Sequence, residues 1–398
     1  MFENIIGQGI TIEILKKELL AKNLPRALLF SGPQYTGKLS TALETARVLT
    51  CHEEKGEWNC SCKACRDQRV LSHTDTLLLG PHDFNVEIAA AADVLRRTRK
   101  LSAQYIFVRA ARKLTRRFDQ ILWEGEDSKI RKVQSLIAEL EERLDAFSPD
   151  SDLPEKEELE KSLERIMEVS LQLIPVLSAD NIPINQIRRA SYWSHLSTTG
   201  SNKVLILENA DRMHESSRNS LLKILEEPPE DVFLILLTAN KGAMISTILS
   251  RVRSYSFVER SVRETRDVLR RIFQEEDEKY SSIRNYFSYW QELNPEVLTK
   301  LARKYVDLLL ADKKEELDIF TEMKTLLSTK EKRSSVSFFL EELVNIYYEG
   351  YRSGQLSPSR LQRWLSMTQN KHAALNRLNL NPSLVVESLF YSLSELAQ

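Results

Sequence analysis

The sequence lacks long apolar runs and has almost no net charge. No stretch approaches the roughly 20 apolar residues that a helix needs to cross a bilayer, so we expect no contact with a membrane. The 56 Lys and Arg residues nearly balance the 57 Asp and Glu residues, and a net charge of -1 excludes a global field that would draw the chain to nucleic acid. The segment MFENIIGQGI has neither a basic nor an apolar region, so we expect no secretion signal and a cytoplasmic location.

Cysteine is also scarce, and all four cysteines lie in one short segment. In a cytoplasmic chain, such a cluster favours a metal site over disulfides or idle thiols, which are the alternatives. Four thiolates suit a closed, tetrahedral structural Zn²⁺ site. The spacing C-x8-C-x-C-x2-C therefore predicts a zinc module over residues 51–65. Its expected ligands are Cys51, Cys60, Cys62 and Cys65, and His52 is the substitute if Cys60 does not reach the metal.

Strand and helix patterns alternate in two parts of the chain, about 1–80 and 181–260. Residues 27–30, 204–207 and 232–237 are continuous apolar runs of the kind found in strands buried on both faces. Strands that alternate with helices imply a parallel sheet with right-handed crossovers. We therefore predict an α/β domain over residues 1–260, and from about Val262 onward the pattern is helical.

Residues 82–180 do not fit the sheet and predict a helical insertion. Leucines recur at helical spacing, and we expect two or three helices with a turn over residues 148–154. The first part is basic and the second acidic. The basic face could contact DNA phosphates, but we favour pairing between the basic and acidic helices, since no aromatic stacking pattern accompanies the basic residues. His73, in the polar loop before the insertion, is expected at the surface.

The segment 32–39 matches the phosphate-binding loop G-x-x-x-x-G-K-[ST] except at its last position. It follows a predicted strand and opens a helix, so its backbone N–H groups and the helix dipole can face phosphates. The hydroxyl that should reach Mg²⁺ is replaced by Leu39, and Ser40 is rotated about 100° away along the helix. The expected nucleotide-binding residues of this loop are Gly32, Thr36, Gly37, Lys38 and Leu39.

The second half of such a site is altered as well. An apolar strand ends in Glu208-Asn209, where an Asp for Mg²⁺ and a Glu that activates water are usual. An amide cannot act as a general base, so Asn209 removes the proton acceptor. Two independent changes point to a site that does not hydrolyse ATP.

Several segments resemble the clamp-loader AAA+ subunits of bacterial DNA polymerase III. The resemblance covers about 1–80 and 181–260 well and 330–398 loosely, and the insertion has no counterpart in it. It lies in the opening box Asn4–Gln8, the segment Asn219–Pro229, the strand end Leu236–Asn240, the S-R-C-like segment Ile248–Arg253 and the C-terminal Asn379–Leu389. The cysteine spacing also resembles the zinc module of these subunits, C-x8-C-x2-C-x2-C, but it is one residue shorter between the second and third cysteines.

The resemblance implies a fold, partners and roles. It implies an AAA+ P-loop domain over 1–260, a helical lid over 261–325 and a helical oligomerisation collar over 326–398. Clamp loaders are pentamers with ATP sites between subunits, so Arg251 is the expected arginine finger in a neighbour's site, with Glu208 and Thr238 lining the chain's own degenerate site. The implied partners are the gamma/tau and delta subunits, the sliding clamp and primed DNA.

The combination of a retained arginine and a lost ATPase resembles the delta-prime subunit. Two alternatives stay open: a gamma/tau-like ATP-hydrolysing motor that uses Glu208 as a metal ligand, and a scaffold whose insertion binds another replication factor. ATP binding without turnover and no binding at all also stay open.

Overall fold

The computed structural model describes residues 1–53, 56–178, 181–198, 200, 202–276, 280, 282–290, 295–311, 332–377 and 381–395. The chain divides into two compact units, Met1–Phe287 and Ser288–Gln398. The first unit holds the α/β alternation and the insertion. The expected three-part division stays a prediction, and its boundary near residue 325 lies outside the described residues.

A five-stranded parallel sheet organises the first unit, with the strand order β2-β3-β4-β1-β5. Every residue of the first four strands along the chain is buried, as their continuous apolar runs predict. The non-sequential order requires helical crossovers between neighbouring strands. The strands are β1 (Ala27–Ser31), β2 (Thr76–Leu79), β3 (Lys203–Leu207), β4 (Val232–Thr238) and β5 (Arg253–Ser256).

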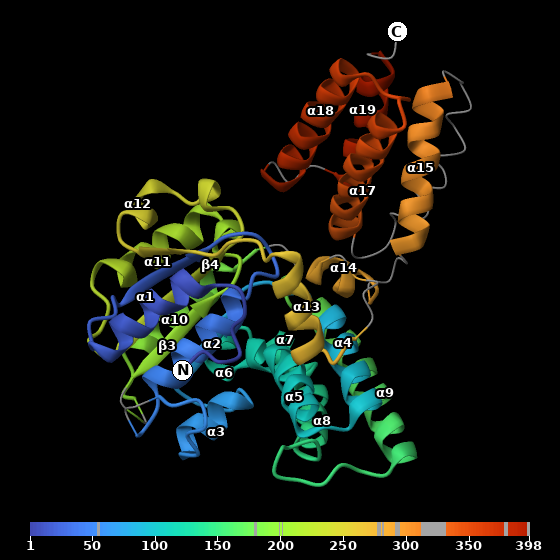
Figure 1. Ribbon diagram of the computed structural model, residues 1–398. Helices are drawn as coiled ribbons and strands as arrows, with labels where there is room; N and C mark the ends of the chain where they lie inside the picture. The colour runs from blue at the N-terminus through green and yellow to red at the C-terminus, as the bar shows by residue number, and fades with distance from the viewer. Residues whose placement is uncertain are drawn as a thin grey trace. The chain divides into compact units, whose positions relative to one another are not determined.

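Helices cover both faces of the sheet, so two cores form (Figure 1). Alternate strand residues such as Leu28 and Ile206 pack with α1 and α2, whereas Leu29 and Leu207 pack with α10, α11 and the insertion. Outside the insertion, the first unit has α1 (Gly9–Leu20), α2 (Lys38–Leu49), α3 (Lys63–Arg69), α10 (Ile184–Ser194), α11 (Glu215–Glu226), α12 (Ser246–Leu249) and α13 (Val262–Arg271).

The insertion is larger than predicted. Two or three helices were expected, but the described residues hold four long helices and two short ones between β2 and α10. The expectation was wrong because α4 is built on alanine, whose small side chains leave no leucine period to read. The expected turn over 148–154 is confirmed. The helices are α4 (Phe84–Thr98), α5 (Leu101–Thr115), α6 (Gln120–Trp123), α7 (Asp127–Arg131), α8 (Gln134–Asp145) and α9 (Lys156–Leu173), with the 3₁₀ turn η1 (Arg116–Phe118) after α5.

The basic part of the insertion pairs with its acidic part, as favoured from the sequence. Arg112 on α5 reaches Glu141 at 3.1 Å and Asp145 at 2.9 Å, both on α8. Arg96 on α4 lies 2.7 Å from Glu160 on α9. Arg96 and Arg112 are thus paired with acidic side chains of the insertion itself.

His73 corrects one expectation. Its side chain is buried, not at the surface, and its Nδ1 accepts a hydrogen bond of 3.1 Å from the backbone N–H of Asp75. Burial lowers the pKa of His73 below its ordinary value. Polar neighbours in the sequence suggested a surface loop, but the loop turns back toward β2.

The described part of the second unit is a helical bundle. The unit begins at Ser288, the last residue of α14 (Ile283–Ser288). Its described helices are α15 (Pro295–Ala311), α17 (Lys332–Arg352), α18 (Pro358–Arg377) and α19 (Pro382–Glu395). Asn379 and Leu380 of the C-terminal motif lie outside the described residues. Trp364, Tyr305 and Tyr347 are fully buried in its core.

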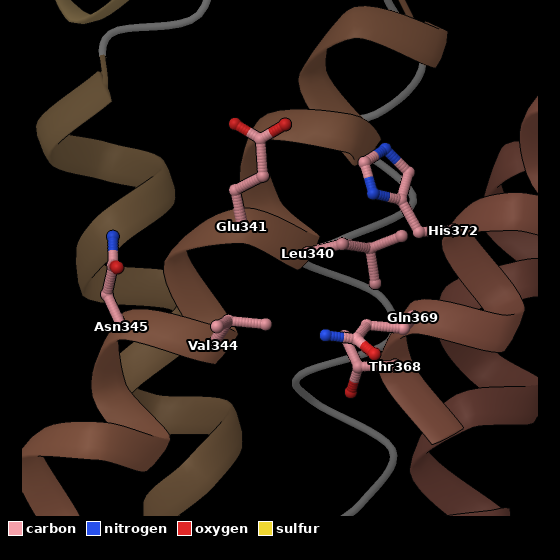
Figure 2. Close-up of a pocket in the computed structure, with 7 residues that line it drawn as sticks. All are labelled: Leu340, Glu341, Val344, Asn345, Thr368, Gln369 and His372. Carbon is pink, nitrogen blue, oxygen red and sulfur yellow. The ribbon is translucent and has the colours of Figure 1, made fainter. Parts of the chain in front are cut away.

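A shallow pocket of about 290 Å³ opens between α17 and α18 (Figure 2). Leu340 and Val344 from α17 face Thr368 and His372 from α18. None of the site residues predicted from the sequence lines this pocket. Among the helices that the structure describes, none is long and apolar enough to span a bilayer.

Because the insertion shares one core with the sheet, we expect it to unfold together with the sheet. Leu163 on α9 is fully buried in that core, so Leu163→Ala should lower the free energy of unfolding by about 2–5 kcal/mol in urea denaturation followed by circular dichroism. Leu171→Ala, on the same helix but 48% exposed, is the matched control and should change it by less than about 0.5 kcal/mol. A separate early transition in Leu163→Ala would show instead that the insertion folds independently.

Candidate functional site

The phosphate loop lies between β1 and α2, as predicted. An ideal Cβ at Gly32 would lie 2.0 Å from the carbonyl oxygen of Phe257, so only glycine fits there. Gly37 adopts the left-handed conformation (φ +92°) as the N-cap of α2, and no side chain caps this helix end. The loop therefore has the shape of a phosphate cradle, with the N-terminus of α2 turned toward it.

Lys38 turns back onto its own loop. Its Nζ donates to the carbonyl oxygen of Gly32 at 2.7 Å and also to that of Pro33. Burial, opposed by the nearby carboxylates of Asp211 and Glu208, lowers the pKa of Lys38 to about 8. The ammonium group is thus held by loop carbonyls at the point where a phosphate would be bound.

The neighbouring loop side chains offer no metal ligand. Thr36 is buried and its hydroxyl donates to the carbonyl oxygen of Pro33 at 2.9 Å. Leu39 packs against the apolar core beneath α2. Ser40 is exposed, in keeping with its expected rotation away from the cradle.

Arg260 joins this site, although no sequence pattern predicts it. Its Nε donates to the carbonyl oxygen of Ile6 at 2.9 Å, and its Nη1 donates to that of Tyr35. An ideal Cβ at Gly37 would lie 2.7 Å from its Nη2. One guanidinium thus ties the opening box to the phosphate loop and closes one side of the cradle.

Glu208 stands at the end of β3, where the metal-binding carboxylate was expected, but both of its oxygens are engaged. His82 Nδ1 lies 3.0 Å from Oε2, and Arg117 Nη2 donates to Oε1. Glu208 is 5% exposed, so water does not separate these groups. In the sequence, His82 comes just before α4 and Arg117 lies in η1, just after α5.

The ion pairs continue from Glu208 into the insertion. His82 Nε2 lies 2.5 Å from Glu87, which also pairs with Lys113. We call the five side chains the Glu208 network: His82, Glu87, Lys113, Arg117 and Glu208. It has three cationic and two anionic members when His82 is protonated, and such a network is stable only if every member keeps its partner.

Electrostatics in the network favour the charged forms. Burial alone would raise the pKa of Glu208, but His82 and Arg117 outweigh it and hold that pKa below its ordinary value. Burial alone would lower the pKa of His82, yet Glu208 and Glu87 raise it to about 9. His82 is therefore an imidazolium at neutral pH, and both of its ring nitrogens donate.

Asn209 lies just after β3, and Thr238 is the last residue of β4. Asn209 is left-handed (φ +50°), and its side-chain amide donates to the carbonyl oxygen of Pro81 at 2.8 Å. Thr238, at the end of β4, donates to Asp211 at 2.6 Å and accepts from the backbone N–H of Asn240 at 2.9 Å. Neither Asn209 nor Thr238 offers a base that could activate water.

Arg251 lies apart from these groups, just after α12. It is about one-third exposed, and it pairs with Glu226 at 2.7 Å and donates to the carbonyl oxygen of Thr247 at 2.9 Å. An exposed pair of this kind contributes only about 0–1 kcal/mol, so the guanidinium is free to exchange partners.

The four cysteines form a second candidate site. Their sulfur atoms all lie within 4.8 Å of one another, and the Sγ atoms of Cys51 and Cys60 are 3.7 Å apart. Sulfur atoms bound tetrahedrally at about 2.3 Å from Zn²⁺ are about 3.8 Å apart, so the residues present fit this ion. Cys60 reaches the cluster, so the geometry does not call for His52, whose side chain is exposed.

Local backbone donors favour the thiolate form of one of these cysteines, Cys62. Cys62 is the N-cap of α3, and its sulfur accepts from the backbone N–H of Cys65 at 3.5 Å. Burial alone would raise the pKa of Cys62, but this donor and the backbone N–H of His52 lower it to about 6. The thiolate is the form that binds a metal.

A buried arginine fixes the cysteine cluster to α2. Arg47 is 2% exposed; it donates to Glu44 at 2.7 and 2.9 Å, to the carbonyl oxygen of Gly56 at 2.9 Å and to the sulfur of Cys65 at 3.1 Å. Its guanidinium thus links the helix to the middle of the cysteine segment and to its last cysteine.

The cradle, the strand order and the polar strand ends together define an AAA+ module of the P-loop class. The chain belongs to the family described as DNA polymerase III, delta subunit, whose model matches residues 7–139 and 133–261.

Curated relatives agree with this family over short stretches. The chain is 32% identical over 85 residues to DNA polymerase III subunit delta' of Bacillus subtilis, covering 21% of this chain and 26% of that protein. It is 45% identical over 56 residues to subunit delta' of Buchnera aphidicola subsp. Schizaphis graminum (14% and 17%) and 38% identical over 66 residues to subunit tau of Bacillus subtilis (16% and 12%). The chain thus aligns with about a quarter or less of the length of these relatives.

A gamma-subunit-related protein of DNA polymerase III from Thermotoga maritima is similar in structure, with 20% identity and a TM-score of 0.32 over 58% of this chain and 90% of that one. A score this low does not define the fold, which rests on the strand order above.

The Glu208 network predicts a pH dependence of stability. The pKa of His82 is about 9 in the folded chain and 6.5 when unperturbed, so the folded state binds more protons between these values. Its stabilising contribution is complete below about pH 6.5 and is lost as the pH rises through 9. We expect the free energy of unfolding, measured in urea, to fall by on the order of 3 kcal/mol more in the wild type than in His82→Gln over this range.

Comparing the two proteins removes the effect of Lys38. Its pKa is about 8, below the ordinary value for lysine, so it stabilises the folded chain as the pH rises and acts in the opposite sense to His82. Parallel pH profiles for the wild type and His82→Gln would contradict the pairing of His82 with Glu208.

Proposed function

We propose that the chain is a delta-prime-type clamp-loader subunit that helps to place a sliding clamp on primed DNA and does not itself hydrolyse ATP. One observation carries the loss of hydrolysis: both carboxylate oxygens of Glu208 are engaged by His82 and Arg117. Family membership supports the clamp-loader role.

The residues present do not fit a productive Mg²⁺–ATP complex. Both oxygens of this buried carboxylate are already engaged by cations, an imidazolium and a guanidinium, and this opposes its use as a ligand for Mg²⁺. Leu39 supplies no hydroxyl, and Asn209 is no base. Hydrolysis needs metal and base together, so we derive no hydrolytic step in this chain.

Arg251 is the proposed contribution to catalysis in the assembly. Exposed near the edge of the module and held only by a surface pair with Glu226, it can be released toward a neighbouring subunit. An arginine finger stabilises the charge that develops on the transferred phosphoryl group. Arg251 would act on the neighbour's ATP, and the chain itself would serve as a stator.

The proposed partners are the gamma/tau and delta subunits in a hetero-pentamer, the sliding clamp, and primed DNA through the complex. The helices beyond residue 260 would provide the lid and collar. Clustered thiols and work on chromosomal DNA support a cytoplasmic setting.

The motor alternative is less well supported. A gamma/tau-like subunit needs Glu208 as a metal ligand, and the ion pairs of Glu208 oppose that use. The similarity to a tau subunit over 66 residues does not favour this alternative, since the chain still has Leu39 in place of a hydroxyl and Asn209 in place of an acid.

We also propose a structural Zn²⁺ at Cys51, Cys60, Cys62 and Cys65. The ion would join the end of α2 to the start of α3, and four thiolates leave it no open position for catalysis.

The proposed function predicts where ATP turnover resides. The purified chain alone should show no DNA- or clamp-stimulated ATP hydrolysis, whereas the complex with its cognate motor subunits should hydrolyse ATP. Arg251→Ala should lower turnover at the one site that it completes by on the order of 10³-fold, measured in single-turnover assays.

The matched control is Glu226→Ala, which removes the acidic partner of Arg251 and keeps the arginine. It should retain turnover in the complex. Steady hydrolysis by the isolated chain that disappears in Lys38→Ala would contradict the stator role and make this chain a motor.

The zinc proposal predicts one tightly bound ion per chain. Cys60→Ser should abolish stoichiometric zinc in metal analysis of the purified protein and lower its melting temperature, because metal binding contributes directly to folding. His52→Ala should keep the ion. Stoichiometric zinc in Cys60→Ser together with zinc loss in His52→Ala would assign the fourth ligand to His52 instead.

A further inference from the structure

The insertion also contacts the segment that follows α13, which is far from Glu208 in the sequence. The C-terminal end of α4 lies beside the segment that follows α13 (Figure 1). Arg97 donates from Nη1 to the carbonyl oxygen of Gln274 and from Nη2 to that of Phe273, both at 3.3 Å, and its Nη2 lies 3.8 Å from Glu275. Lys100 donates to the side-chain oxygen of Gln274 at 2.6 Å.

Gln274 is the residue on which these contacts converge. It is left-handed (φ +52°), a conformation that a non-glycine residue adopts only when its surroundings hold it there. Its side-chain amide donates to the carbonyl oxygens of Arg270 and Arg271 at 3.3 and 3.1 Å, which closes the end of α13. The same side chain thus caps α13 with its nitrogen and accepts from Lys100 with its oxygen.

The segment also connects to the phosphate loop through aromatic rings. Phe273 packs against Phe287 with ring centroids 5.4 Å apart. Phe287 stacks on Tyr35 of the loop, with centroids 5.3 Å apart and the planes 26° apart. Arg284 donates to Gln34, also in the loop, at 3.2 Å.

The two ends of α13 are therefore both held to the α/β module. At its start, Arg260 joins the opening box to the phosphate loop, and Ser261 and Glu264 form a capping box. At its end, Arg97 and Lys100 hold the Phe273–Glu275 segment.

We propose that the insertion is an internal brace, in which Arg97 and Lys100 hold the end of α13 and so keep Phe273 and Phe287 against the phosphate loop without nucleotide. In this arrangement the position of α13 is set by protein contacts. The inference concerns the isolated chain, so it does not depend on clamp loading.

An ordinary surface ion pair would not have this effect, since exposed pairs contribute little. Here the acceptors are main-chain and side-chain carbonyls at a helix C-terminus, where cations are favoured by the helix dipole. Asp93 orients the guanidinium of Arg97 at 2.6 Å from the previous turn of α4. The geometry is therefore fixed from both sides.

The test compares two variants on α4. In Arg97→Ala/Lys100→Ala, amide hydrogen exchange followed by mass spectrometry should become roughly tenfold faster over residues 262–276, with no change in β1 or β4. Arg96→Ala is the matched control, because it removes a neighbouring arginine that pairs with Glu160 inside the insertion. It should leave exchange over 262–276 as in the wild type.

Two results would overturn the brace. The first is unchanged exchange over 262–276 in the double variant. The second is an equal acceleration in Arg96→Ala, which would mean that any loosening of the insertion has the same effect. If the double variant does not fold, Gln274→Ala tests the same contact from the other side, and unchanged exchange there would also overturn it.

Discussion

Two cations hold the carboxylate of Glu208 at the end of β3, and much of the first unit depends on that contact. His82 and Arg117 reach it from either side of α4 and α5, so one buried charge attaches the insertion to the sheet edge. Breaking a buried pair by removing one partner costs about 3–5 kcal/mol, because the remaining charge is left without compensation. The same contact also opposes the use of this carboxylate as a metal ligand.

The cysteine cluster, the phosphate loop and the proposed brace are connected to this contact through a few helices. Helix α2 carries Lys38 at its start and Arg47 near its end, so the cysteine cluster and the phosphate loop are joined by twelve residues of helix. The end of α4 holds the segment after α13, whose Phe273 leads through Phe287 to Tyr35. The proposed stator role suits a body whose parts hold one another without a nucleotide.

Much of the fold could be predicted because its signals are local. Continuous apolar runs marked β1, β3 and β4, and cysteine spacing identified the cluster despite its short middle interval. The partners of Glu208 could not be predicted, since they lie 126 and 91 residues away and the packing of the insertion on the sheet leaves no periodic trace. Arg117 stood among many basic residues with nothing to distinguish it, and Arg260 acts through main-chain carbonyls, which carry no sequence signal.

The pairing of Glu208 also has an evolutionary consequence, because it makes the proposed loss of hydrolysis hard to reverse. Freeing the carboxylate for a metal requires replacing both His82 and Arg117, and the double replacement leaves Glu208 as a buried charge without its two cations. With total stabilities of about 5–15 kcal/mol, a folded intermediate on that route is scarce. Under the proposed function, substituting Asn209 with glutamate alone would not restore hydrolysis, because Glu208 would stay paired with both cations. A lineage with these pairs would then rely on a neighbouring subunit for ATP hydrolysis.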